Sequence, residues 1–217
     1  MYQQSTLWEY SEVLEEEVSQ QQAKGEPLSL PDGDILIYKN LFSSTESSTF
    51  FTNLLNDVNW QQDYIKLYGK SIPLPRLTAW YGDGDKSYTY SGIKMKPKSW
   101  TPTLLEIKSR IEKLAEMRFN SVLLNLYRNG KDSVAWHSDD ELELGQNPPI
   151  GSVSFGGSRR FSLRHKHRKD LKIIDIDLTN GSFLLMKGAT QHYWQHQIPK
   201  TAKIVQPRIN LTFRVIF

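Results

Sequence analysis

The stretch RINLTFRVIF, residues 208–217, alternates between polar and apolar side chains from Arg208 to Val215. Successive side chains of an extended strand point to opposite faces, so one face carries two arginines, an asparagine and a threonine. The other face carries Ile209, Leu211, Phe213, Val215 and Phe217. We therefore expect a sheet strand with one buried face, and a polar face that is either solvated or part of a binding site.

Shorter runs of the same β-strand character precede this stretch and are separated by turn signals such as Asn129-Gly130 and Asn180-Gly181. They are SVLLNLY (121–127), SVSF (152–155), RRFSLRH (159–165), IIDIDL (173–178) and SFLLMK (182–187). Further upstream, helical spacing predicts two amphipathic helices. One follows a capping box of Ser43 and Glu46, and the other starts at Thr101 and runs to about Arg118. Helices followed by strands predict an α+β fold whose β part is a sandwich or jelly roll.

Length and composition limit the function classes. The chain has 217 residues, of which 38% are hydrophobic, enough for one core. It contains no cysteine, which excludes disulfides, thiolate zinc sites, iron–sulfur clusters and cysteine nucleophiles. No apolar run is long enough for a membrane span, and the polar start does not resemble a secretory signal. We expect a soluble intracellular protein, cytoplasmic or nuclear, that is monomeric and does not bind membranes.

Charge is distributed unevenly along the chain. Residues 1–30 hold six Glu against one Lys, whereas the whole chain has a net charge of +3. We interpret residues 1–30 as an acidic, mobile leader and residues 31–217 as a single domain, with its strand core at 121–217. A basic body suits a polyanionic partner such as nucleic acid, although solubility explains it equally well.

A metal site is predicted by the histidines. His137 and Asp139 are two residues apart in AWHSDDE, so they point the same way if this segment is extended. With His196 they would form a triad of two histidines and one carboxylate, which binds Fe(II) and leaves coordination positions open. A surface or capping role is the alternative. His192 stands four residues before His196, but HYWQH lacks the Glu of HExxH, and its context favours a strand and a turn.

Two strands could bind a dicarboxylate next to this metal. Arg208 and Arg214 flank the polar face of the last strand, and guanidinium donors match the oxygens of a carboxylate. Asn125 and Tyr127 share a face of the 121–127 strand. Each strand alone has an ordinary structural explanation, but together with the triad they describe one site.

Taken together, these motifs resemble the AlkB-type Fe(II)/2-oxoglutarate-dependent nucleic-acid dioxygenases, and most closely the DNA alkylation-repair branch. The matching segments are LNLYRNGKDSVAWHSDDELELG, IGSVSFGGSRRFSLRHK, GSFLLMKGATQHYWQHQIPK and PRINLTFR, with PRLTAWYGD and YTYSG upstream. The resemblance covers roughly residues 60–217. It implies a double-stranded β-helix (jelly roll) with flanking N-terminal helices.

The resemblance also implies roles for individual residues. Iron would be bound by His137, Asp139 and His196. The distal carboxylate of 2-oxoglutarate would be held by Asn125, Tyr127 and Arg208, with Asn210 and Thr212 lining the pocket and Arg214 approaching the carboxylate that chelates the metal. Molecular oxygen is the second co-substrate.

Base recognition is expected in residues 61–98 and after the iron-binding aspartate. The implied substrate-binding residues are Leu67, Tyr68, Gly69, Arg76, Tyr88, Tyr90, Asp140 and Glu141. Leu67-Tyr68-Gly69 aligns with a finger that fills the gap left by a flipped base, and Tyr90 could stack on that base. A carboxylate at Asp140 or Glu141 favours a cationic base. A basic run could contact phosphates or be a solvated hairpin; it comprises Arg159, Arg160, Arg164, Lys166, Arg168 and Lys169.

The implied function is oxidative demethylation of N-alkylated bases in DNA, of the 1-methyladenine and 3-methylcytosine type. This direct-reversal repair would act on duplex or single-stranded DNA, with RNA as a further substrate, and would release formaldehyde, succinate and CO₂. The alternatives are an RNA demethylase or protein hydroxylase with the same cofactors, and a non-catalytic reader of modified nucleic acid.

Overall fold

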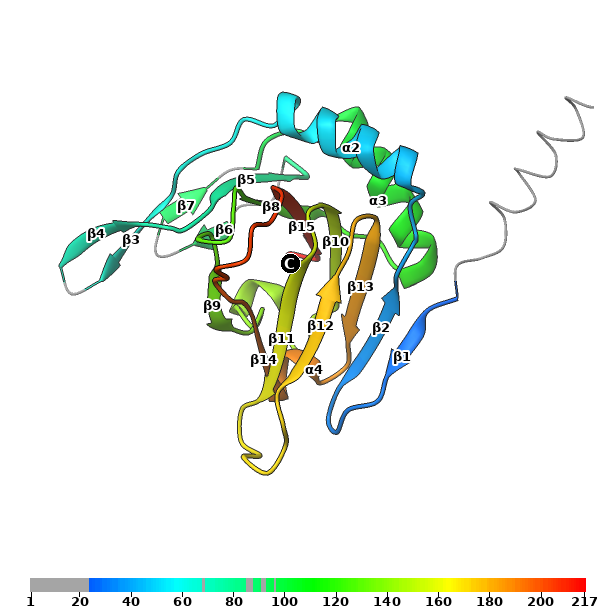
Figure 1. The fold of residues 1–217 in the computed structure, drawn as a ribbon, viewed down its shortest axis with the longest axis vertical. Coiled ribbons are helices and arrows are strands. Elements are labelled where there is room, and N and C mark those ends of the chain that lie inside the picture. The colour runs from blue at the N-terminus through cyan, green and yellow to red at the C-terminus, as the bar shows by residue number, and fades with distance from the viewer. Residues whose placement is uncertain (1–23, 68, 85–87, 91–92, 96) are drawn as a thin grey trace, which may run out of the picture.

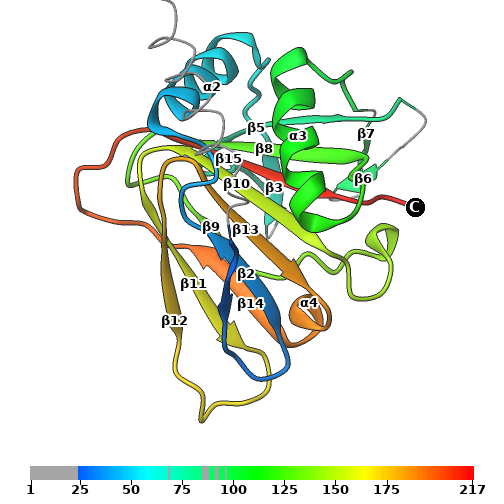
Figure 2. The same ribbon diagram turned by 90° about the vertical axis from the view of Figure 1, so that its right-hand side faces the viewer.

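Two antiparallel sheets that face each other form the body of the protein (Figures 1 and 2). The computed structural model describes residues 24–67, 69–84, 88–90, 93–95 and 97–217. The larger sheet runs in the order β1 (Glu26–Leu28), β2 (Asp34–Tyr38), β13 (Ser182–Lys187), β10 (Ile150–Gly156), β15 (Arg208–Arg214), β8 (Ser121–Tyr127) and β5 (Leu77–Gly82). The smaller sheet runs in the order β12 (Ile174–Leu178), β11 (Arg159–His165), β14 (Trp194–Ile198) and β9 (Val134–His137). This arrangement confirms the predicted jelly roll.

Strand β15 lies inside the larger sheet, and its alternation separates two environments. Ile209, Leu211 and Phe213 are fully buried in the core that the helices cover. The polar side chains of the strand point to the opposite face, between the two sheets, and each is at most 9% exposed. This burial excludes a solvated polar face. Buried polar side chains need hydrogen-bond partners or a ligand.

Two helices cover the outer face of the larger sheet, α2 (Ser44–Asp57) and α3 (Pro102–Ala115) (Figure 1). The predicted capping box is present: the Ser43 hydroxyl accepts from the Glu46 amide, and the Glu46 carboxylate accepts from the Ser43 amide. Thr101 caps α3, as predicted. Helix α3 ends before the predicted Arg118 because Glu116 takes a left-handed conformation at φ +54°. No helix of the described residues is long and apolar enough to cross a bilayer.

The strand core extends beyond the predicted limits of 121–217. Strands β2 and β5 join the larger sheet, and β5 lies inside the 61–98 segment, where we expected recognition loops. Part of the expected leader is also structured, because β1 pairs with β2. Residues 1–23 lie outside the described part of the chain. At the other end, β15 stops at Arg214 and Phe217 is 83% exposed, so the apolar face does not continue to the last residue.

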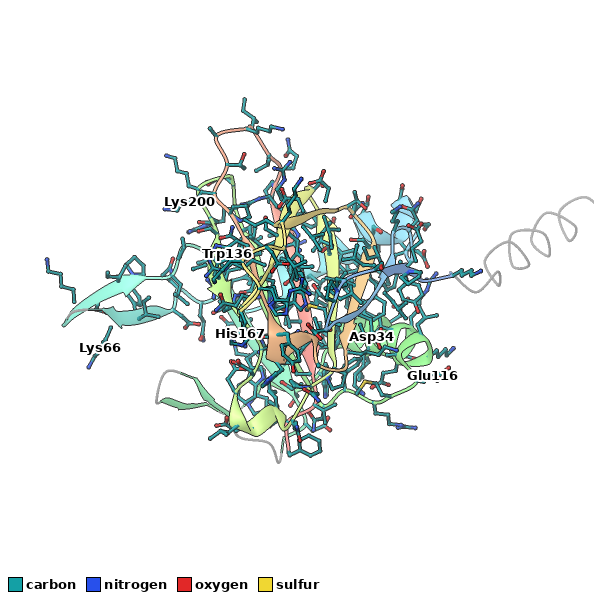
Figure 3. The ribbon with its side chains drawn as sticks, turned by 90° about the horizontal axis from the view of Figure 1, so that it is seen from below. Asp34, Lys66, Glu116, Trp136, His167 and Lys200 are labelled. Carbon is teal, nitrogen blue, oxygen red and sulfur yellow. The ribbon has the colours of Figure 1, made fainter. Side chains whose placement is uncertain are left out.

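Two small hairpins stand apart from the main sheets: β3 (Tyr64–Leu67) with β4 (Lys70–Pro73), and β6 (Tyr88–Tyr90) with β7 (Ile93–Met95). The β3–β4 hairpin projects from the body, with Lys66 standing away from it (Figure 3). It does so on the same side of the molecule as Trp136 and Lys200 (Figure 3).

The turn between β8 and β9 connects two strands that carry site residues. Its central contact is Asp132, which is buried and accepts hydrogen bonds from the Arg128 amide at 2.8 Å and from two guanidinium nitrogens of Arg128. Burial raises the pKa of Asp132, but the hydrogen bonds and the charge of Arg128 outweigh burial and hold the pKa below 3.8. The charged form of Asp132 therefore stabilises the fold.

We predict that Asp132→Asn lowers the free energy of unfolding by about 1–3 kcal/mol at neutral pH, because the Arg128 donors lose a charged, buried acceptor. Since the folded-state pKa is lowered, the contribution is present above the unfolded-state pKa and disappears as the pH falls below about 4. Urea unfolding between pH 3 and 7 measures both effects. Asp170→Asn removes an exposed partner of Arg168 and should leave the midpoint unchanged. An Asp132→Asn deficit that is constant with pH would contradict the assignment.

Candidate functional site

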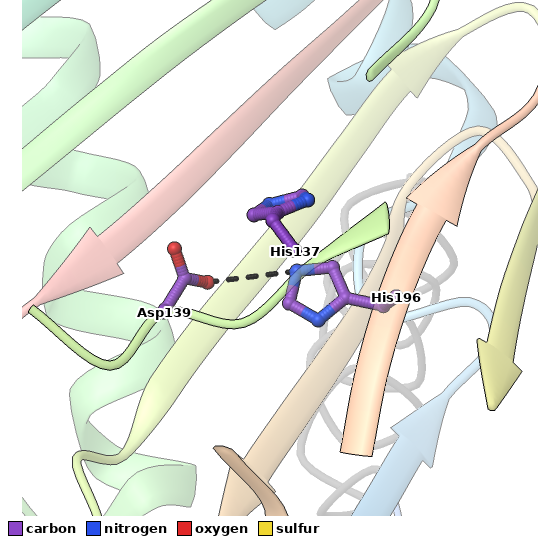
Figure 4. A group of neighbouring side chains, drawn as sticks. All are labelled: His137, Asp139 and His196. Atoms are coloured by element: carbon purple, nitrogen blue, oxygen red, sulfur yellow. Dashed lines mark ion pairs between the residues drawn. The ribbon is translucent and has the colours of Figure 1, made fainter. Parts of the chain in front are cut away.

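Three side chains that could bind one metal ion converge between the sheets (Figure 4). Strands β9 and β14 are neighbours, and their register places His137 directly opposite His196, with ring centroids 4.3 Å apart. Asp139 follows β9 by two residues, and its Oδ2 lies 3.7 Å from Nε2 of His196. The potential ligand atoms of the three residues all lie within 4.8 Å of one another. The structure therefore brings the predicted triad together.

Hydrogen bonds and charges orient the triad for metal binding. Nδ1 of His137 lies 2.8 Å from the Ala135 carbonyl, which can only accept, so Nδ1 carries a proton and Nε2 is the atom left for a metal. Burial and the neighbouring His137 lower the pKa of His196 to about 3, so this ring is neutral at physiological pH. Burial raises the pKa of Asp139, but the charge of Arg214, the largest opposing effect, helps to outweigh burial and lower the pKa to about 2. The neutral His196 ring and the Asp139 carboxylate are thus available as metal ligands.

The predicted dicarboxylate-binding residues line the same cavity as the triad. The cavity measures about 500 Å³, within the usual size range of small-molecule sites. Its lining includes Asn125, Tyr127, Arg208, Asn210, Thr212 and Arg214, together with the triad. The register of the larger sheet explains the convergence, because β15 pairs with β8 and so places Arg208 opposite Tyr127 and Asn210 opposite Asn125.

Arg208 is the buried cation of this cavity. It is 1% exposed, its Nη2 donates to the Ser154 hydroxyl at 2.9 Å, and its guanidinium lies over the Tyr127 ring. Its Nε and Nη1 are buried and have no hydrogen-bond partner among the described residues. Burial lowers the pKa of Arg208 to about 10, so it stays charged at neutral pH. A buried cation with two unsatisfied donors is a binding site for an anionic group.

Arg214 lines the cavity, and its guanidinium donates to Asp139. This contact joins the dicarboxylate-binding strand directly to the triad, because both residues line the same cavity. The expected place of Arg214 beside the ligand carboxylate that chelates the metal stays a prediction.

Of the expected base-binding residues, Glu141 and Arg76 line the cavity. Oε2 of Glu141 is buried and has no hydrogen-bond partner among the described residues. Arg76 donates to Oδ1 of Asn125 at 2.7 Å, so it orients a predicted ligand-binding residue. Asp140 is more exposed and pairs with Lys166 at 2.9 Å.

The predicted finger falls at the end of the β3–β4 hairpin. Gly69 has a φ of +76°, which favours glycine, and nothing lies within 4 Å of the place where its Cβ would be. Tyr68 lies outside the described residues, and so do the side chains of Leu67, Tyr88 and Tyr90.

The basic run does not act as one surface. Arg159 is 3% exposed and donates to the backbone carbonyls of Asn129, Asp132 and Pro199, so it stabilises loops and is not available to phosphates. Arg164 is exposed and lies over the Trp136 ring at 4.4 Å. The alternation of β11 explains the difference, because successive residues of a strand face opposite sides.

Sequence reasoning missed several groups that complete the site. Ser152 and Ser154 on β10 hydrogen-bond the side chains of Asn210 and Arg208. Trp136, next to His137, lines the cavity. A serine at every second position of a strand, as in SVSF, is the signal that could have identified the first two.

His192 lies outside the triad, as expected, but the prediction of its local structure is wrong. It lies in a single helical turn, α4 (Thr190–Tyr193), rather than in a strand and turn, and it is exposed. Thr190 fixes this turn by hydrogen bonds with the backbone of Asp34 on β2 and with the Lys187 carbonyl.

Comparison with known proteins identifies the family. A sequence model of the 2OG-Fe(II) oxygenase superfamily matches residues 34–214. The chain belongs to this superfamily. Its members use Fe(II), 2-oxoglutarate and O₂, so the cofactors expected from the sequence are confirmed.

Two curated relatives are similar in sequence to most of this chain. "Alpha-ketoglutarate-dependent dioxygenase alkB homolog 3" of Mus musculus is 43% identical over 191 residues, covering 84% of this chain and 66% of that protein. "DNA oxidative demethylase ALKBH2" of Homo sapiens is 37% identical over 188 residues, covering 82% of this chain and 72% of that protein. The solved structure "The structure of OsALKBH1" matches with a TM-score of 0.62 at 17% identity, covering 88% of this chain and all of that chain, and supports the fold alone. The chain spans slightly less than two thirds of the length of the mouse relative.

The residues of the cavity fit the cofactors of a 2OG-Fe(II) oxygenase. Three ligands on one side of a metal leave positions open for a chelating keto-acid and oxygen. The unsatisfied donors of Arg208 suit the far carboxylate of a dicarboxylic acid, which Tyr127 and Asn125 would flank.

We predict that Arg208→Met weakens 2-oxoglutarate binding by about 100-fold or more, because paired charge-assisted hydrogen bonds are lost. The same change should leave the unfolding midpoint of the free protein unchanged or higher, since a buried and incompletely bonded charge is replaced by an apolar side chain. Calorimetric titration with Mn(II) present and thermal unfolding measure the two effects. Arg160→Met, on an exposed arginine, should change neither. Binding of 2-oxoglutarate to Arg208→Met at wild-type strength would exclude this role.

Proposed function

We propose that this 2OG-Fe(II) oxygenase is a DNA demethylase that removes methyl groups from 1-methyladenine and 3-methylcytosine. The observation that carries the proposal is the joint position of the triad and the unsatisfied Arg208 in one cavity. The relative named a DNA oxidative demethylase, at 37% identity, supports DNA as the substrate. A monomeric enzyme is part of the proposal, and it is supported by the fact that one chain carries both the triad and Arg208. A DNA substrate also implies work in the compartment that holds DNA, the nucleus or the cytoplasm of its source.

The proposal assigns the protein residues as follows. His137, Asp139 and His196 would hold the metal. Arg208, Asn125 and Tyr127 would hold the far carboxylate of 2-oxoglutarate, with Asn210 and Thr212 beside it. Fe(II) with 2-oxoglutarate and O₂ supplies the oxidation of an N-methyl C–H bond, from which the hydroxylated methyl leaves as formaldehyde, with succinate and CO₂ as co-products.

The protein itself contributes placement and charge. The triad stays fixed because its strands are paired and because Arg214 holds Asp139. Arg208 fixes one end of the keto-acid, so the other end is directed at the metal. Such positioning lowers the barrier by presenting one C–H bond in a reactive geometry.

Selection of the base would rest on Glu141 and Asp140. Glu141 has a buried oxygen without a hydrogen-bond partner among the described residues, which can accept from the exocyclic amino group of adenine or cytosine. Methylation at N1 of adenine or N3 of cytosine gives the base a positive charge, and a carboxylate stabilises that charge. An unmethylated base carries no such charge and would bind less tightly.

Contact with the nucleic acid would involve residues 61–98 and the rim of the cavity. Ile65 of the β3–β4 hairpin and Lys200 both line the cavity. The hairpin projects from the body (Figure 3). Leu67, Tyr68 and Gly69 would reach the stack from which the base is taken. Tyr88 and Tyr90 would contribute stacking to the flipped base.

We predict that the wild-type protein releases formaldehyde from methylated DNA only when Fe(II) and 2-oxoglutarate are both present. A panel of 1-methyladenine and 3-methylcytosine oligonucleotides, as single-stranded DNA, duplex DNA and RNA, with a methylated peptide, measures the substrate class. His137→Ala should abolish turnover, because the metal loses a ligand. Faster turnover of RNA or peptide than of DNA would replace the proposed substrate, and binding of methylated DNA without turnover would make the protein a reader.

We predict that Tyr68→Ala lowers turnover on duplex DNA about tenfold, with little change on single-stranded DNA. The reason is that only the duplex leaves a gap to be filled, and stacking of one aromatic ring on a base is worth about 1–3 kcal/mol. Steady-state rates on matched single-stranded and duplex oligonucleotides measure the ratio. Tyr64→Ala, at the exposed start of the same hairpin, is the matched control. An equal loss on both substrates would contradict a wedge.

A further inference from the structure

The loop of residues 138–141, which follows β9, sets the position of Asp139 in the triad. His137 and His196 are fixed by strand pairing, whereas Asp139 lies beyond the end of β9 and has no strand partner among the described residues. The distance from the Asp139 carboxylate to the two imidazoles therefore depends on how residues 138–141 are fixed. A misplacement of this ligand by a fraction of an ångström would change the metal geometry.

The backbone of Asp139 is fixed by Gln191. Its amide donates to Oε1 of Gln191 at 2.9 Å, and this hydrogen bond is buried. Gln191 is 1% exposed and lies on α4, 52 residues along the chain from Asp139. Its Nε2 contacts Sδ of Met186 on β13 at 3.4 Å, so both ends of the amide group are held. Gln191 does not line the cavity, so it has no direct role in binding the co-substrate.

Two more contacts join the same segments. The Ser138 hydroxyl donates to the Trp194 carbonyl at 2.9 Å. Nζ of Lys166 donates to the Asp140 carboxylate at 2.9 Å and to the Gln191 carbonyl at 3.0 Å. Each residue from Ser138 to Asp140 is thus connected to α4 or to the start of β14.

The segment 190–196 links these contacts to the second histidine. Gln191 lies on its first turn, and His196 lies five residues later on β14. The segment is itself anchored, because the Trp194 indole donates to the Pro31 carbonyl at 2.8 Å. One short piece of chain therefore carries the third ligand of the triad and fixes the backbone of the second.

We propose that Gln191 is a positioning residue for metal binding, which sets the place of Asp139 relative to His137 and His196 by accepting the Asp139 amide. The inference rests on the proposed metal site. The side chain of glutamine suits this role because its oxygen accepts the hydrogen bond while its nitrogen is held against Met186. Arg214 fixes the carboxylate of Asp139, and Gln191 fixes its backbone, so the residue is held at both ends.

The test is the affinity of the metal-free protein for Mn(II) alone, measured by calorimetry and by the electron paramagnetic resonance signal of free Mn(II). Gln191→Met keeps the length of the side chain and removes the acceptor, and we expect at least tenfold weaker binding, the usual effect of removing a group that orients a metal ligand. Gln191→Glu keeps an acceptor oxygen and should restore most of the affinity. The visible spectrum of the Co(II)-loaded protein should change in the Met variant and not in the Glu variant.

The matched control is Gln195→Met, the same substitution one residue before His196. Gln195 accepts from Arg164 on the outside of the sheet, so we expect wild-type Mn(II) affinity. If Gln191→Met fails to fold, Gln191→Asn, whose amide is one carbon too short to reach Asp139, provides the same comparison. Wild-type affinity in the Met or Asn variant would overturn the proposal, and so would equal losses in the Glu and Met variants. Failure of the wild-type protein to bind Mn(II), by contrast, would reject the metal site itself.

Discussion

The structure depends on the burial of a polar row between two sheets. Strand β15 can bury its apolar face under the helices only by directing Arg208, Asn210, Thr212 and Arg214 into the opposite sheet interface. Two buried guanidinium groups are costly unless anions accompany them. Arg214 has an internal partner in Asp139, but Arg208 has two donors that no described residue satisfies. The strand therefore offers a place for an acidic ligand at one end, and at the other end Asp139 supplies the carboxylate.

Local patterns predict the elements well, because they depend on short-range rules. The capping box at Ser43, the cap at Thr101 and the alternation of β15 are all visible in the sequence and present in the structure. Residues that depend on sheet register are harder to predict. That Arg208 meets the Ser154 hydroxyl follows from the pairing of β10 with β15, which no local pattern encodes. The burial of Arg159 escapes prediction for the same reason, since it is set by the loop that covers this side chain.

Some residues of the site are positioned by neighbours in the sequence, and others by residues far away along the chain. His137 and Asp139 are two positions apart, so their spacing along the chain is enough to indicate a shared site. His196 is distant in sequence, so its spacing along the chain indicates nothing about a shared site, and the register of β9 with β14 explains its place. Gln191 has no motif of its own, because its role is a single hydrogen bond to a backbone amide 52 residues away. A side chain whose role is a hydrogen bond to the backbone of a distant residue belongs to no local sequence motif.

The paired strands of the two sheets and the projecting β3–β4 hairpin have different structural roles. The triad and Arg208 lie on paired strands or are tied to them, which suits a site where small displacements weaken metal binding. The β3–β4 hairpin pairs only with itself among the described strands and projects from the body (Figure 1). Under the proposed function, this hairpin would contact the nucleic acid without moving a metal ligand. Since Ile65 lines the cavity and the triad lies on other strands, substitutions in the hairpin would alter substrate choice at little cost to the chemistry.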